Sequence, residues 1–100
     1  MTLSTRVESE DERSRIVALR ALADPLRLAL VDELAVAPAC ACELRERLQL
    51  SAPLLSHHLR VLREAGLIRC ERSGRRLEVE LDRAAVEHVA ESLLGRGRVA

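Results

Sequence analysis

The chain has 100 residues, of which 48% are hydrophobic, and its 16 basic and 16 acidic side chains give a formal net charge of zero. A chain of this length forms one small domain that buries only about two thirds of its unfolded surface, so dimerisation would stabilise it. Phe, Tyr and Trp are absent, which excludes aromatic stacking on single-stranded nucleic acid. No apolar run approaches a membrane span of roughly 18 residues, and no export signal opens the chain, so we expect a cytoplasmic protein without membrane contacts.

The first half of the chain predicts three helices. Residues 1–10 are polar and lack periodicity, and we expect them to form a disordered arm. A helix with apolar residues along one side follows from Asp11. Asp24 and Pro25 end it and begin the next, because Asp caps a helix and Pro suits its first turn. This second helix is apolar around much of its surface, which places it at the centre of the domain, and residues 40–50 predict a short third helix.

Residues 51–66 predict a fourth helix that has two different faces. Ser51 is a suitable N-cap, Pro53 suits the first turn, and Gly66 ends the helix because glycine adopts a left-handed conformation easily. The apolar stripe consists of Leu55, Leu59 and Leu62. The polar residues on or beside the opposite side are Ser56, His57, Arg60 and Arg63. One face therefore packs against the domain, and the other displays hydrogen-bonding groups.

A β-hairpin and a last helix complete the predicted order. Residues 67–72 and 76–81 predict two strands joined by a turn at 73–75, and Asp82 caps the final helix, which Gly95 and Gly97 end. A short helix, a tight turn, a second helix and a hairpin form a winged helix-turn-helix, a mainly α fold with a small β-hairpin. Residues 51–76 contain six Arg against two Glu. The positive charge thus gathers on the unit that could enter a DNA groove.

The segments ALADPLRLALVDEL, CACEL, SAPLLSHHLRVLREAGLI and ERSGRRLEVEL follow one another along the chain. In this order they resemble the metal-sensing winged-helix repressors of the ArsR/SmtB family. The predicted elements form an ααααββα domain over residues 11–94, followed by a flexible tail over 95–100. The resemblance implies a homodimer held by the first and last helices. It also implies that the dimer binds a palindromic operator in double-stranded DNA. The DNA-binding residues that it implies are Ser51, Ser56, His57, Arg60, Arg75 and Arg76.

Three cysteines in a chain without an export signal predict reduced thiols. The segment from Cys40 to Cys42 is similar to the Cys-x-Cys segment of arsenic, cadmium and lead sensors in the same family. The resemblance implies that both residues bind such a thiophilic ion as an inducer that folding does not need. In a regular helix, residues two apart point about 200° apart, so shared binding requires an unwound helix start. Arg45 stands where arsenic sensors have a third cysteine, and Cys70 is the only other thiol. The alternative interpretation is that the cysteines are small buried hydrophobic residues.

Other functions are compatible with the same fold. Cys40 and Cys42 could respond to thiol oxidation in place of metal, or the regulator could respond to neither. A winged-helix module that binds another protein and has lost DNA binding is a further alternative. We expect no enzyme, because no catalytic triad, phosphate-binding loop or carboxylate pair is present. His58 is expected to pack internally, His88 to be solvated, and Leu54 to face DNA where a polar residue would be usual.

Overall fold

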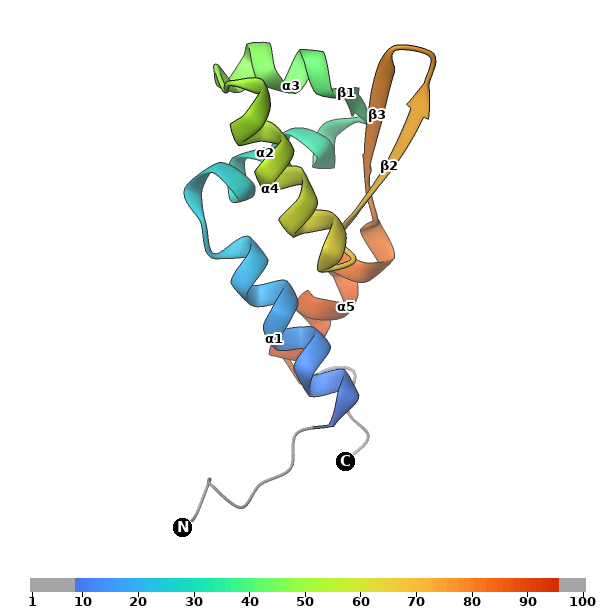
Figure 1. Ribbon diagram of the computed structural model, residues 1–100. Helices are drawn as coiled ribbons and strands as arrows, with labels where there is room; N and C mark the ends of the chain where they lie inside the picture. Colours follow the sequence, from blue (N-terminus) through green and yellow to red (C-terminus); the bar gives the residue numbers. More distant parts are fainter. Residues whose placement is uncertain (1–8, 96–100) are drawn as a thin grey trace.

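A computed structural model describes residues 9–95 (Figure 1). The helices are α1 (Glu10–Leu22), α2 (Pro25–Val36), α3 (Ala41–Leu48), α4 (Ala52–Glu64) and α5 (Arg83–Leu93). The strands are β1 (Ala39–Cys40), β2 (Ile68–Ser73) and β3 (Arg76–Leu81). This order confirms the predicted winged helix-turn-helix. Residues 1–8 and 96–100, which make up most of the predicted arm and tail, lie outside the described residues.

The first two helices begin at side-chain caps. The Ser9 hydroxyl accepts a hydrogen bond of 3.1 Å from the Glu12 N–H, so α1 begins one residue earlier than predicted. Asp24 accepts from the N–H groups of Leu26, at 2.9 Å, and Arg27, at 3.1 Å. The bond from Arg27, together with the bond from Leu26 and the Arg27 charge, lowers the pKa of the Asp24 carboxyl. The predicted boundary between α1 and α2 is confirmed.

The helix-turn-helix consists of α3, a tight turn and α4. Gln49 ends α3 in the left-handed region, with φ 53°, and the Leu50 N–H donates to the Arg45 carbonyl at 3.0 Å. The Ser51 hydroxyl then accepts from the Leu54 N–H at 3.3 Å and caps α4. The left-handed residue turns the chain sharply, and the new cap begins the next helix almost at once. Cap and turn together fix the direction of α4 relative to α3.

The sheet has three antiparallel strands in the order β1-β3-β2. Strands β2 and β3 form the predicted hairpin, which closes at the pair Ser73 and Arg76 around Gly74, with φ 62°. Strand β1 was not predicted, because two residues are too few to show strand periodicity. Cys40 of β1 lies opposite Glu78 of β3. This strand joins the start of α3 directly to the hairpin, which forms the wing.

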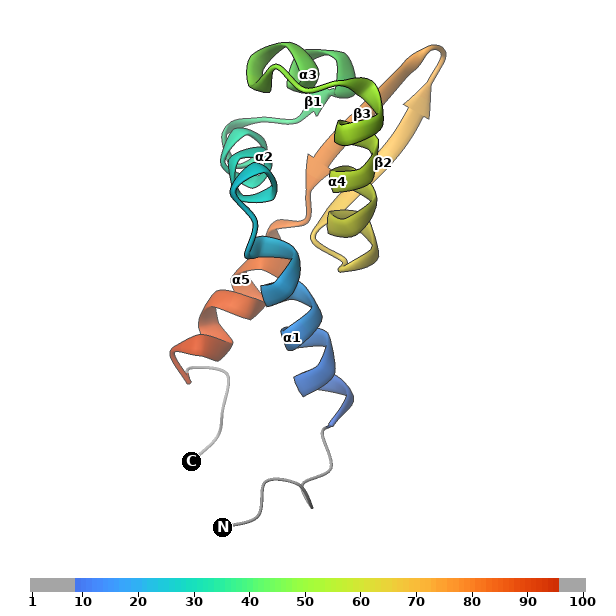
Figure 2. The same cartoon turned by 60° about the vertical axis from the view of Figure 1, so that its left-hand side comes forward.

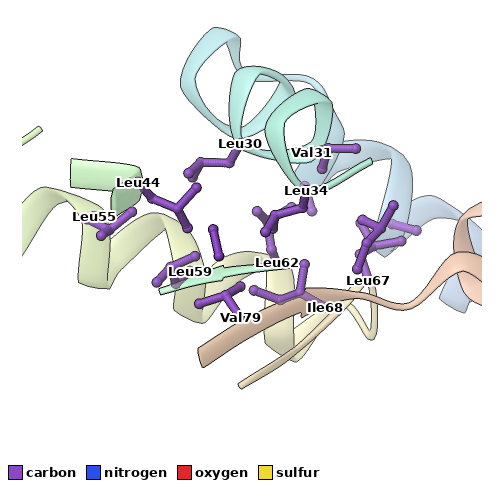
Figure 3. Packing of buried hydrophobic residues seen from close by; sticks show 14 of the residues in the cluster. Leu30, Val31, Leu34, Leu44, Leu55, Leu59, Leu62, Leu67, Ile68 and Val79 are labelled. Carbon is purple, nitrogen blue, oxygen red and sulfur yellow. The ribbon is translucent and has the colours of Figure 1, made fainter. Parts of the chain in front are cut away.

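The core is built entirely from aliphatic side chains and lies between α2, α3, α4 and the sheet (Figure 3). The labelled side chains Leu30, Leu34, Leu44, Leu62 and Val79 point toward one another, and each is at most 1% exposed. Burial of one such side chain stabilises the fold by roughly 1.5–3 kcal/mol. Two of these leucines come from α2, as its predicted central place requires. The core holds α4 by its inner face.

Helices α1 and α5 lie side by side at the end of the molecule that is far from the hairpin tip (Figures 1 and 2). The Arg15 side chain of α1 donates to the Ser92 carbonyl of α5 at 3.4 Å. Val89 of α5 is only 7% exposed within one protomer and therefore belongs to the core, whereas Leu93 is 60% exposed and Val17 is 48% exposed. Between residues 9 and 95, no helix has both the length and the apolar character needed to cross a bilayer.

Candidate nucleic-acid interface and cysteine pair

The outer face of α4 is polar and open. Ser56, His57 and Arg60 are all exposed, and Leu54 beside them is 40% exposed. The opposite face is buried in the core through Leu55, Leu59 and Leu62. The backbone of this helix is thus fixed on one side, while the other side projects the predicted DNA-binding groups together with one leucine.

Two histidines lie where the sequence analysis expected them. His58 is 5% exposed, and its Nδ1 lies 3.1 Å from an Arg27 guanidinium nitrogen. The Arg27 Nε donates to the Ala21 carbonyl at 2.6 Å. Burial, together with the nearby Arg27 charge, lowers the pKa of His58, although Asp24 opposes the shift. His58 is therefore a packing histidine, as predicted. His88 is exposed on α5, also as predicted, and its Nε2 lies 3.3 Å from an Asp11 carboxylate oxygen.

The two arginines at the wing have different surroundings. Arg76 begins β3, and its Nε donates to a Glu78 carboxylate oxygen at 3.0 Å. A second nitrogen lies 3.8 Å from Glu43 of α3, and these carboxylates, led by the bond to Glu78, raise the pKa of Arg76. Arg75 lies in the turn and has no ion pair with any carboxylate of residues 9–95. Its full charge faces solvent.

A cleft of about 410 Å³ lies between α3, α4 and the hairpin. Its base is apolar and includes Leu55, Leu59 and Leu77. Six guanidinium groups surround it, and no Asp or Glu of the described residues lines it. These groups belong to Arg45, Arg60, Arg63, Arg72, Arg75 and Arg76. No role was predicted for Arg45 or for Arg72 of β2, because the spacing within one segment cannot show that four segments of the chain meet at this cleft.

The cleft carries strong positive charge. Among its six arginines, only Arg76 forms ion pairs with carboxylates of residues 9–95. Glu80, a nearby carboxylate that does not line the cleft, lies 3.2 Å from Arg69. Concave sites lined by one sign of charge concentrate ions of the opposite sign. The cleft is therefore suited to anions, and it adjoins the exposed face of α4.

The cysteine pair occupies the start of α3. Cys40 has an extended backbone, with φ −81° and ψ 157°, and Cys42 lies in the first helical turn. The two sulfur atoms therefore converge, as shared ligation of one ion requires, and they are joined by a disulfide with Cα atoms 5.3 Å apart. The expectation of reduced thiols is thus wrong for this pair in this structure. Sequence spacing did not reveal this, because a regular helix would separate the two side chains.

Cys40 also caps α3 with its sulfur atom. The Glu43 N–H donates to the Cys40 sulfur at 3.3 Å, and the Glu43 carboxylate accepts from the Cys40 N–H at 2.9 Å. This is a capping box in which cysteine takes the place usually held by Ser or Thr. Because Glu43 also lies near Arg76, the cap connects the cysteine pair to the wing.

The third cysteine does not complete a metal site. Cys70 of β2 is half-buried, and burial raises the pKa of its thiol, with Arg63 opposing the shift. Among residues 9–95, no three His, Cys, Asp or Glu side chains gather closely enough to hold a metal ion. Cys40 and Cys42 together could offer two soft donors once reduced. Any further ligand must come from outside residues 9–95 of one protomer.

A winged helix-turn-helix with an exposed polar helix beside an arginine-lined cleft defines the class of DNA-binding regulators. Residues 24–69 match the family model described as "Bacterial regulatory protein, arsR family". The chain belongs to this family. It is 33% identical over 75 residues to the arsenical resistance operon repressor of Staphylococcus xylosus, covering 75% of this chain and 72% of that one.

A second relative is the HTH-type transcriptional repressor SmtB of Mycobacterium tuberculosis, 43% identical over 76 residues. The match covers 76% of this chain but only 54% of the relative, so the chain spans about half the length of that protein. These relatives are regulators and not enzymes, in agreement with the predicted class.

Solved structures show the same architecture. An ArsR-like transcriptional regulator from Rhodococcus sp. RHA1 superimposes with a TM-score of 0.79 at 26% identity, over 89% of this chain and 84% of that one. A winged helix-turn-helix domain from Mycobacterium bovis, described as homodimeric, superimposes with a TM-score of 0.72 at 20% identity, over 87% and 85% of the two chains. The second likeness is one of fold alone.

Proposed function

We propose that the protein is a transcriptional repressor that binds a palindromic operator as a homodimer. The observation that carries the proposal is the exposed polar face of α4 beside a cleft in which five arginines lack carboxylate partners among residues 9–95. Uncompensated arginines bind phosphate, and a helix with a free polar face fits the major groove. The repressor relatives support the same function.

Each candidate side chain has a different part in this proposal. Ser56 and His57 face outward from α4 and contact base edges. Arg60 lies one turn further along on the cleft side and contacts phosphate. The Ser51 hydroxyl accepts a helix N–H but can still donate its proton to a phosphate oxygen. At the wing, Arg75 contributes more than the carboxylate-paired Arg76 does.

The test is the salt dependence of binding to the DNA upstream of its own gene. We expect a palindromic site there, with an affinity that falls steeply as salt rises, because each phosphate contact releases counterions. A scrambled duplex of the same composition serves as the control. Equal affinity for both duplexes, or an affinity indifferent to salt, would show that the protein is no sequence-specific DNA-binding regulator and would favour a protein-interaction module.

We propose that the inducer is a thiophilic ion such as arsenite, cadmium or lead, bound by reduced Cys40 and Cys42. The two sulfur atoms already lie together at the start of α3, and thiolates prefer soft ions. The Glu43 N–H that caps Cys40 would also stabilise a thiolate there. Reduced Cys40 and Cys42 would hold the ion as thiolates, and solvent or another part of the dimer would provide the further ligand.

The sheet and the cap give this site a route to the DNA-binding surface. Cys40 lies opposite Glu78 on β3, and the Glu43 side chain lies between Cys40 and Arg76. A change in the position of Cys40 therefore moves both the wing strand and one of its arginines. If this displacement differs between free and DNA-bound protein, it becomes a coupling free energy, typically about 1–3 kcal/mol.

Titration of the reduced protein with cadmium or lead tests the inducer. We expect thiolate charge-transfer absorption that Cys40→Ser and Cys42→Ser each abolish and that Cys70→Ser retains. Apparent affinity should rise with pH, because the ligands must lose protons. An operator affinity that metal does not alter would remove the ion as inducer.

The disulfide favours a second candidate, a regulator that responds to the redox state of the same pair. Formation of the bond fixes the start of α3, and reduction releases it. The operator affinity of the oxidised protein should then differ from that of the metal-free reduced protein, and Cys42→Ser should remove the difference. Equal affinities in the two states would leave metal as the better candidate.

A further inference from the structure

The disulfide presents only one of its sulfur atoms to solvent. Cys40 is 0% exposed, whereas Cys42 is exposed and lines the arginine-lined cleft. Thiol exchange requires a thiolate to approach one sulfur of the bond, and its rate depends on which sulfur is accessible. A dissolved thiolate can therefore reach the Cys42 sulfur and not the Cys40 sulfur.

The cleft beside Cys42 selects by charge and by size. Five of its six arginines lack a carboxylate partner among residues 9–95, and its base is apolar. A volume of about 410 Å³ accommodates a small organic molecule and is too small for a folded protein segment. The matching ligand has negative charges for the guanidinium groups and carbon atoms for the leucine base.

We propose that this cleft binds a small organic thiol of net negative charge, which attacks the Cys42 sulfur. The incoming thiolate forms a bond to Cys42 while the bond between Cys42 and Cys40 breaks. The electron pair leaves on Cys40 as a thiolate, and the products are a mixed disulfide at Cys42 and one free cysteine. The thiol is the only reactant required. This thiol would be the reactant in the redox-responsive regulation proposed above, on which this step rests. The exchange itself requires no DNA.

The surroundings of the Cys40 sulfur favour its departure as a thiolate. The Glu43 N–H donates to the Cys40 sulfur at 3.3 Å, at the N-terminus of the eight-residue helix α3. A helix N-terminus and a direct N–H donor both favour a thiolate over a thiol, and a stabilised leaving thiolate departs faster. Cys70, the other cysteine of the cleft, competes poorly because burial raises the pKa of its thiol.

The first experiment compares thiols of different charge on the oxidised Cys70→Ser protein. Glutathione carries net negative charge, mercaptoethanol is neutral and cysteamine is positive. Each rate is divided by the rate of the same thiol with hydroxyethyl disulfide, which removes differences in intrinsic reactivity. We expect glutathione to exceed cysteamine by about tenfold or more, with the advantage shrinking as salt rises. Equal normalised rates would overturn the proposal.

Matched charge variants show whether the cleft causes the preference. Arg45→Gln with Arg60→Gln should remove most of the glutathione advantage. Arg13→Gln with Arg20→Gln removes the same number of charges from α1 and should preserve it. If the glutathione preference persists in the first double variant, or if both double variants reduce it equally, the cleft is not the binding site.

A second measurement reaches the same mixed disulfide by another route and gives a stable product. In the Cys40→Ser, Cys70→Ser protein, Cys42 is the only cysteine and can attack glutathione disulfide, releasing one glutathione thiolate. Mass spectrometry should show the adduct on Cys42, formed faster than the adduct from positively charged cystamine. If cystamine reacts as fast after the same normalisation, the cleft does not select anions. The readout requires no DNA, so it is independent of whether the protein represses transcription.

Discussion

His57 and Arg75 are both exposed but differ in what they can recognise. The His57 ring lies on the outer face of a helix whose inner face is fixed in the core, so in the proposed complex it would contact a single position of the DNA. Arg75 lies at a two-residue turn with a free charge. A fixed side chain distinguishes bases, whereas a mobile charge attracts any phosphate.

We expect His57→Ala to weaken operator binding by about 1–3 kcal/mol while leaving random DNA almost unaffected. Arg75→Ala should weaken binding to both and reduce the salt slope by about one unit. Titrations of operator and random duplexes at several salt concentrations check both. If the two substitutions act alike, α4 does not present its outer face to the bases.

His58 predicts a pH dependence of stability. Its pKa is lower in the folded protein than in the unfolded chain because it is buried, with the Arg27 charge adding to this effect. The unfolded chain therefore binds more protons, and stability falls as pH drops below the unfolded value of about 6.5, until the folded pKa is reached. One such group gives a slope of at most about 1.4 kcal/mol per pH unit.

Urea unfolding between pH 5.5 and 7.5 measures this effect. His58→Gln retains an acceptor for Arg27 but cannot titrate, so it should show a smaller loss of stability on acidification. The difference between the two proteins at each pH isolates the contribution of His58. An equal loss in both proteins would mean that His58 does not govern this part of the pH profile.

At the scale of the elements, helix boundaries were predicted most accurately where one short motif determines them. Asp24 with Pro25 and Ser51 with Pro53 marked helix starts through local hydrogen bonding, and both starts agree with the structure within one residue. Strand β1 was missed because its existence depends on β3, nearly forty residues later in the chain. The sulfur atom that caps α3 was also not predicted, because cysteine is not a usual capping residue.

The capping box of α3 can be tested through Glu43. Glu43→Gln removes the charge that faces Arg47 and Arg76 and weakens the bond to the Cys40 N–H, so we expect a loss of about 0.5–1 kcal/mol in stability. Glu46→Gln, which changes an exposed carboxylate on the same helix, is the matched control and should change stability little. Chemical denaturation measures the free energy of unfolding of both variants. A loss of equal size in the control would show that net charge, and not the cap, is responsible.

At the scale of the whole molecule, the helix pair at the far end offers a surface for a second copy. Leu93 and Leu94 are 60% and 64% exposed, and Val17 of α1 adds to the apolar surface. Symmetric pairing of the same patch on two copies is the commonest arrangement among soluble oligomers. The sequence predicted these two helices but not which of their residues are exposed, because Val89 belongs to the core.

We expect a dimer at micromolar concentration that dissociates on Leu93→Asp with Leu94→Asp. Both side chains are exposed, so the protomer should stay folded while charge disrupts the interface. Val36→Asp, at a position that is 85% exposed on α2, should remain dimeric. Light scattering with circular dichroism as a folding control distinguishes the cases. A monomeric native protein would contradict the arrangement.

The arginine-lined cleft also belongs to this scale, and no local pattern could predict it. The charge count of residues 51–76 showed that positive charge gathers in one region, but Arg45 lies outside that region. The cleft exists only because the turn after α3 and the sheet bring separate segments together. Periodicity describes one element at a time, whereas a cavity depends on how several elements pack.

The aliphatic core has a further consequence for optical measurements. A chain without Phe, Tyr or Trp has no aromatic side chain to give a near-ultraviolet circular dichroism signal. The Cys40–Cys42 bond is then the chromophore that contributes in that spectral region. Near-ultraviolet ellipticity, which normally reports tertiary packing, would here follow the opening and closing of one covalent bond, and folding itself would have to be followed in the far ultraviolet.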